Sequence, residues 1–138
     1  MLFRSVTGMV WYNPITTTIK EYPTFVQTAV WTRDAHEGSA NNEEISFNSK
    51  EGLVIFGDIS LSYQLDMQKA PEFYVKFRSD DLNHFTHGFL RNIARDAFNE
   101  IASKYMVDEL YGVKKEDFLR EVRDRINKIG RASCRERV

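Results

Sequence analysis

The chain has 138 residues, of which 42% are hydrophobic and 28% charged, and its formal charge at neutral pH is −1. This length fits one domain with a modest core, and a mildly acidic chain lacks the basic face that nucleic-acid binding requires. Its only cysteine, Cys134, lies in the last ten residues, so neither a disulfide framework nor a cysteine-based zinc site is expected.

The first part of the chain predicts strands. Residues 5–12 are β-prone and end at an Asn13–Pro14 turn signal, and residues 15–20 are rich in β-branched side chains, which favour pleated backbone. Another strand is expected over residues 24–32, where side chains alternate between two faces. The polar residues 33–42 then predict a loop.

A hairpin is expected around residues 48–52, because Gly52 can adopt a positive φ without steric cost. The following run from Leu53 to Leu65 alternates with period two, so we expect the longest strand there, central to the sheet. Gly57 interrupts its apolar face and indicates a bulge or bend. The side chains expected to be buried from this strand are Ile55, Ile59, Leu61 and Tyr63.

The apolar period then becomes helical. Residues 70–77 predict a short helix with Pro71 in its first turn, and a longer helix is expected from Leu82 to about Ser103, capped by Asp80 or Asp81. The side chains of this longer helix that are expected to pack on the sheet are Phe85, Phe89, Ile93 and Ala97. A third helix is expected to start near Phe118. Strands followed by helices favour the α+β class, an antiparallel-rich sheet from the N-terminal half packed against helices from the C-terminal half.

The last ten residues, 129–138, have no apolar stripe of helical period, and their sequence resembles a translated sequencing adapter. We therefore expect residues 1–128 to be native and residues 129–138 to contribute nothing to the fold. The alternative interpretation is the basic end of an amphipathic helix.

An ordered set of motifs resembles the band 7 (SPFH, prohibitin/stomatin-like) family in its bacterial or phage form. The motifs are Gly8–Pro14, Tyr22–Thr32, the Lys50–Leu53 turn with the Asp58–Leu65 strand, and Leu90–Ala97. The resemblance covers nearly all of residues 5–127, which makes them a partial SPFH domain. It implies membrane association, ring-like homo-oligomers and, in several relatives, restraint of a membrane-bound AAA protease. It also implies an N-terminal membrane anchor, a last strand and a coiled coil outside the residues present here.

Phe3, Trp11 and Tyr12 form an apolar and aromatic group at the end that the resemblance places next to the membrane. Tryptophan and tyrosine favour the bilayer interface, because their rings have both an apolar body and a polar atom. The alternative is that they are strand residues in the core, and for Trp11 this is the favoured interpretation.

The resemblance to an oligomeric family also directs attention to residues that could join subunits. Arg95 and Asp96 could form an ion pair between subunits, although an ordinary charged helix surface is the favoured interpretation. A second group has steps of three and four residues, which fit a heptad seam and packing onto the sheet equally well. Its members are Phe118, Leu119, Val122 and Ile126.

No residue pattern points to catalysis, a cofactor or a metal. His84 and His87 lie three residues apart near two aspartates, but a zinc site needs three or four ligands, so a solvated helix face is favoured. Nucleophile elbows, Walker loops and HExxH motifs are absent. We expect a non-catalytic, membrane-associated scaffold without a cofactor, whose partners are its own copies, membrane lipid and a membrane-bound AAA protease. The alternatives are an accessory protein that binds a host membrane protein without forming rings, and a soluble enzyme with an unrecognised site.

Overall fold

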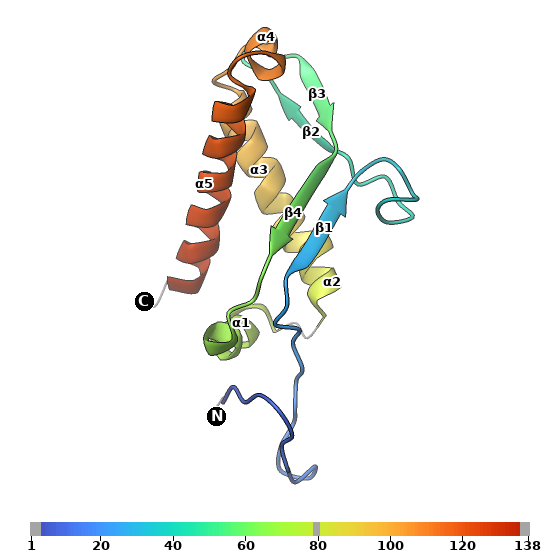
Figure 1. Ribbon diagram of the computed structural model, residues 1–138, viewed down its shortest axis with the longest axis vertical. Coiled ribbons are helices and arrows are strands. Elements are labelled where there is room, and N and C mark those ends of the chain that lie inside the picture. Colours follow the sequence, from blue (N-terminus) through green and yellow to red (C-terminus); the bar gives the residue numbers. More distant parts are fainter. Residues whose placement is uncertain (1–3, 79–80, 136–138) are drawn as a thin grey trace.

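The computed structural model describes residues 4–78 and 81–135, in which short strands come first and helices follow (Figure 1). The strands are β1 (Gln27–Trp31), β2 (Ile45–Asn48), β3 (Val54–Gly57) and β4 (Ile59–Tyr63). The helical elements are η1 (Met67–Lys69), α1 (Ala70–Phe77), α2 (Leu82–His84), η2 (Phe85–Leu90), α3 (Arg91–Ala102), α4 (Val107–Tyr111) and α5 (Lys115–Arg135). The α+β class predicted from the sequence is confirmed. Helix α4 was not predicted.

The strands form two antiparallel pairs, β1 with β4 and β2 with β3. The prediction of one long central strand from Leu53 to Leu65 is wrong, because the run divides at Asp58 and its two halves pair with different partners. The Asp58 carboxylate accepts a hydrogen bond from the Arg33 backbone N–H at 3.2 Å, so this residue is bonded across to the loop after β1. The side of the run that was predicted to face inward does face the core. The four side chains expected to be buried are only half-buried, and they pack against the core: Ile55, Ile59, Leu61 and Tyr63.

Residues 4–26 contain no strand, so the two strands predicted over 5–12 and 15–20 are absent. The third prediction, 24–32, is realised only as β1. The hairpin is as predicted, with Gly52 at φ +79° and the Ser49 N–H donating to the Leu53 carbonyl at 2.9 Å. The difference is physical: the hairpin brings its own pairing partner, whereas the β-branched N-terminal residues have no neighbouring strand to pack against.

The predicted helix from Leu82 is continuous to Ala102, and Asp81 caps it by accepting from the Asn83 N–H at 2.8 Å. Its segment η2, close to the N-terminal end, is a π-helix, which has more residues per turn than an α-helix and therefore rotates the face of α3 that follows. The predicted packing set is wrong in part: Ala97 is buried, but Phe89 is exposed, and Phe85 and Ile93 are half-buried. The buried side chains of α3 are Ala94, Ala97, Phe98, Ile101 and Ala102.

The main core lies between the inner faces of the strands, α3 and α5. Trp31 and Ile45 are its largest fully buried side chains. Three rings, Phe47, Phe98 and Phe118, join β2, α3 and α5, with centroid separations of 5.4, 6.1 and 5.7 Å. Aromatic contacts at this spacing add to the free energy gained by burial.

A second aromatic cluster joins α1 to η2. Phe73, Phe77, Phe85 and Phe89 contact one another with centroid distances of 4.8 to 5.5 Å, and Tyr22 of the N-terminal segment meets Phe73 edge-on at 5.7 Å. Phe85 and Phe89 thus pack on α1 and not on the sheet. The same contacts attach the end of the N-terminal segment to the body of the domain.

Candidate membrane and assembly surfaces

The N-terminal segment carries a turn whose apolar side chains face solvent. The Asn13 carbonyl accepts from the Thr17 N–H at 3.0 Å, and the Asn13 side-chain oxygen accepts from the Ile15 N–H at 3.0 Å. Asparagine favours such turns because its side chain can replace a backbone acceptor. The turn presents Trp11 with 94% of its surface exposed and Ile15 with 91% exposed. Met9, just before it, is 93% exposed.

The core position favoured for Trp11 from the sequence is therefore wrong. Tyr12 is also exposed, whereas Phe3, the third predicted member of this group, lies outside the described residues. Between Arg4 and Lys20 the segment has no charged residue, and Glu21 directly follows Lys20. The turn is thus an apolar and aromatic surface within a stretch that has no carboxylate.

The predicted oligomer-interface residues divide into two groups. Arg95 and Asp96 are exposed on α3 and face solvent. On α5, Phe118 and Val122 are buried in the core and Ile126 packs against it, so these three side chains contact their own domain. Leu119 is the member of the predicted seam that is exposed. From the sequence, a heptad seam and packing within the domain were equally good interpretations. In the structure Phe118 and Val122 pack within the domain.

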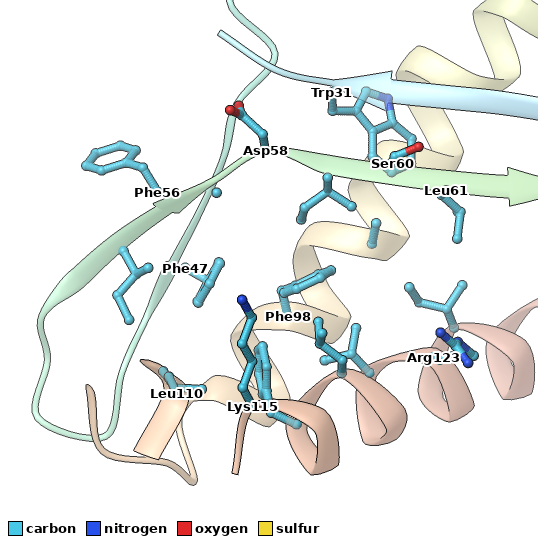
Figure 2. Close-up of a pocket in the computed structure, with 18 of the residues that line it drawn as sticks. Trp31, Phe47, Phe56, Asp58, Ser60, Leu61, Phe98, Leu110, Lys115 and Arg123 are labelled. Carbon is cyan, nitrogen blue, oxygen red and sulfur yellow. The ribbon is translucent and has the colours of Figure 1, made fainter. Parts of the chain in front are cut away.

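A groove of about 490 Å³ lies between β4 and α5 (Figure 2). Its floor is apolar and includes Phe47, Ala94 and Phe98, which belong to β2 and α3. The side chains of Lys115 and Arg123 stand on the α5 wall, and Asp58 and Ser60 belong to the strand wall. Sequence analysis did not find this groove, because its two walls are more than fifty residues apart in the chain. The only indirect indication in the sequence was the spacing of apolar residues along α5, because Phe118, Val122 and Ile126 all line the groove.

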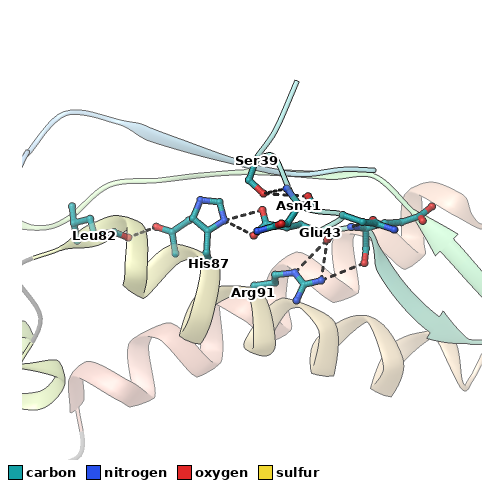
Figure 3. A network of polar contacts seen from close by, with 9 residues as sticks. Ser39, Asn41, Glu43, Leu82, His87 and Arg91 are labelled. Atoms are coloured by element: carbon teal, nitrogen blue, oxygen red, sulfur yellow. Dashed lines mark hydrogen bonds and ion pairs between the residues drawn. The ribbon is translucent and has the colours of Figure 1, made fainter. Parts of the chain in front are cut away.

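Figure 3 shows the polar network that attaches the loop before β2 to η2. The Glu43 carboxylate lies 2.8 and 2.9 Å from His87 Nδ1, and the Arg91 guanidinium donates to the backbone carbonyls of Glu43 and Glu44. His87, considered above as a metal ligand, therefore pairs with a carboxylate. Among the residues that the structure describes, no group of three possible ligands could hold a metal ion.

Two titratable groups with shifted pKa values lie near α4 and α5. The hydrogen bond that Tyr105 donates to Glu121 at 2.8 Å, with burial and nearby carboxylates, raises the pKa of Tyr105. The pKa of Glu109 is lowered, first by its hydrogen bond from Lys114 and then by the Met106 N–H. Both shifts arise from contacts that stabilise the α4–α5 corner, and neither group lines the groove.

Together these features define an α+β domain with an exposed apolar turn at one end and a groove along one helix. The chain matches the model of the SPFH domain / Band 7 family over residues 5–132, and it belongs to this family. The family consists of membrane-associated scaffold proteins that are generally non-catalytic. The comparison with curated proteins and the comparison with solved structures gave no match. Of the helices in the described part of the chain, none combines the length and the apolar character needed to cross a bilayer.

Proposed function

We propose that this domain belongs to a non-catalytic scaffold and rests on a lipid bilayer through the turn around Asn13. The observation that carries the proposal is the near-complete exposure of Trp11 and Ile15 at the turn and of Met9 just before it. Large apolar side chains gathered on a surface are typical of a contact site, and a bilayer interface suits tryptophan in particular.

The charge of the segment supports a lipid partner. Arg4 and Lys20 bracket a stretch without carboxylates, so the turn can approach anionic headgroups without repulsion from its own residues. Membrane contact of this kind is peripheral, because the apolar tip reaches the headgroup region while the folded domain stays outside it.

The chain offers a direct reporter for this contact. It has two tryptophans, of which Trp11 is exposed and Trp31 is fully buried, so a change in emission on binding vesicles reports on Trp11. With vesicles of phosphatidylcholine and phosphatidylglycerol, we expect a blue shift of the emission and co-sedimentation. Salt should weaken binding, since part of the attraction is electrostatic.

A control substitution distinguishes vesicle binding through the turn from binding through any exposed apolar side chain. Trp11→Ser with Ile15→Ser should weaken vesicle binding about tenfold or more, because two apolar anchors are lost. Val113→Ser is the control, since Val113 is 99% exposed in the corner between α4 and α5. Unchanged binding of the double variant, or equal loss in the control, would remove the support for lipid contact.

The finer part of the proposal is that the scaffold assembles with its own copies into a ring or cage and restrains a membrane-bound AAA protease. Its support is the family, with Arg95 and Asp96 exposed on α3 and open to contact between subunits. Cross-linking on vesicles should give a ladder of oligomers that Arg95→Glu shortens. The second candidate function, an accessory protein that binds a host membrane protein without forming a ring, predicts a single band in the same experiment.

A further inference from the structure

Met9 belongs to a loop whose two ends are both attached to the body of the domain. At one end the Ser5 hydroxyl donates a hydrogen bond to the Met67 carbonyl at 2.8 Å. At the other end the Gln64 side-chain amide donates to the Thr24 carbonyl at 2.8 Å. The residues between these attachments project from the end of the molecule that lies opposite α4 (Figure 1). The exposure of Met9 is therefore a property of this loop and does not arise from a loose chain end.

Met9 is the most exposed methionine among the residues that the structure describes. Its surface is 93% exposed, compared with 46% for Met106 and 40% for Met67. The fourth methionine, Met1, lies outside these residues. The surroundings are open as well, since a Cβ placed on Gly8 would meet no atom within 4 Å other than those of its chain neighbours. A small oxidant in solution therefore reaches the Met9 side chain more readily than the other two.

Methionine differs from the other apolar side chains of the loop because its thioether can be oxidised reversibly. Hydrogen peroxide transfers one oxygen atom to the sulfur: an S–O bond forms, the O–O bond breaks, and the sulfur gives two electrons to the oxidant. The departing oxygen takes up the proton of the transferred oxygen and leaves as water. The resulting sulfoxide is polar, and methionine sulfoxide reductases restore the thioether. An exposed methionine on a binding surface can thus switch between an apolar and a polar form.

We propose that Met9 is a site of reversible oxidation by peroxides and that its sulfoxide releases the loop from the bilayer. The inference rests on the lipid contact proposed above, in which Met9, Trp11 and Ile15 are the exposed apolar anchors. The sulfoxide oxygen is a hydrogen-bond acceptor, and placing it at the edge of the acyl chains without a donor opposes insertion. Because Met9 contributes little buried surface to the fold, its oxidation removes an anchor without unfolding the domain.

The test treats the whole chain with hydrogen peroxide. Peptide mapping by mass spectrometry after brief treatment should find the added oxygen on Met9 before Met67 and Met106. The oxidised chain should bind vesicles of phosphatidylcholine and phosphatidylglycerol about fivefold more weakly than the untreated chain, because one apolar anchor is lost. Methionine sulfoxide reductases should restore the binding. Vesicles present during the treatment should slow the oxidation of Met9 but not that of Met106, which lies beside α4 at the other end of the domain.

Three variants assign the effect to Met9, and each is compared with its own untreated form. Met9→Leu has an apolar side chain without sulfur, so peroxide should not change its vesicle binding. It retains Cys134, so an effect of thiol oxidation would appear in this variant as well. Met106→Leu should lose as much binding on treatment as the wild type. Met9→Gln, which is polar and of similar length, should bind as weakly without treatment as the oxidised wild type.

The outcomes distinguish this inference from the lipid contact on which it rests. Unchanged vesicle binding of the oxidised chain, an equal loss in Met9→Leu, or oxidation of Met67 or Met106 ahead of Met9 would each overturn the role of Met9 and leave the lipid contact standing. An untreated chain that does not bind vesicles would overturn the lipid contact itself, and this inference with it.

Discussion

The hydroxyl groups of Tyr63 and Thr86 lie 2.6 Å apart and join the end of β4 to the π-helical segment η2. Thr86 Oγ1 also lies 2.6 Å from the Leu82 carbonyl, to which it can only donate. Its single proton is thereby used, so Tyr63 must be the donor in the bond between the two hydroxyls. Thr86 is buried, and this chain of two bonds fixes the turn from which His87 reaches Glu43.

Removing the Tyr63 hydroxyl should therefore destabilise the fold. Tyr63→Phe is expected to lower the free energy of unfolding by about 0.5–1.5 kcal/mol, the usual net value of one hydrogen bond. Thr86→Val should cost more, because it leaves the Tyr63 hydroxyl without its acceptor. Urea denaturation of the two single variants and the double variant measures the coupling. Thr86→Ser keeps the hydroxyl and serves as the control, and strictly additive losses would argue against the bond.

The π-helical segment decides which side of α3 is sensitive to substitution. Phe98 is buried among Phe47 and Phe118, so Phe98→Ala should lower the free energy of unfolding by about 3–5 kcal/mol. Ile93, on the side predicted from the sequence, is only half-buried, and Ile93→Ala should cost distinctly less. Thermal denaturation followed by circular dichroism ranks the two. The reverse order would place the sheet-facing side of α3 where the sequence alone suggested it.

On α5, substitution of a buried residue should lower the stability of the fold, whereas substitution of a nearby exposed residue should not. Val122→Ala removes buried carbons from the core and should cost roughly 2 kcal/mol. Leu119→Ala should change stability by no more than about 0.5 kcal/mol, as is usual for an exposed site. Because Phe118 and Val122 pack inward, the part of α5 whose side chains the structure describes, residues 115–130, has no apolar seam for a second copy. Light scattering should therefore show a monomer in the absence of lipid. A discrete oligomer that Leu119→Ala dissolves would contradict this expectation.

Acid should remove the stabilisation that Glu109 provides at the corner of α4 and α5. Lys114 Nζ lies 2.5 Å from its carboxylate and the Met106 N–H donates to it at 3.2 Å, which hold the pKa of Glu109 below its ordinary value of 4.5. A carboxyl group whose pKa is lower in the folded state than in the unfolded state stabilises the fold fully when the pH is above its unfolded-state pKa. This stabilisation is lost as the pH falls through the folded-state pKa.

The melting temperature of the wild type should therefore exceed that of Glu109→Gln at pH 7, and the difference should shrink to nothing as the pH is lowered from 4.5. Lys114→Met should show the same convergence, because it removes the other half of the pair. A difference that stays constant between pH 7 and pH 3 would show that the carboxylate charge is not what stabilises this corner.

Local preferences determined a large part of the fold. The hairpin at Gly52, the short helix with Pro71 in its first turn and the cap at Asp81 were predicted, because each depends on the conformational limits of a few adjacent residues. The inward side of the run from Ile55 to Tyr63 was also predicted correctly, since side chains alternate strictly along a strand. The order of strands before helices was enough for the α+β class.

Other features depend on contacts between distant parts of the chain, and only the tertiary structure decided them. Trp11 lies in a stretch whose residues favour a strand. Residues 4–26 contain no strand, however, and the Trp11 side chain is exposed beside a turn. The alternating run divides at Asp58 because its two halves, β3 and β4, pair with different strands, β2 and β1. Val122 fits a heptad seam and a core equally well by spacing, and its place was decided by the cavity that α3 and the strands leave for it. Periodicity reports which residues share a face, whereas the partner of that face is determined by how the elements pack.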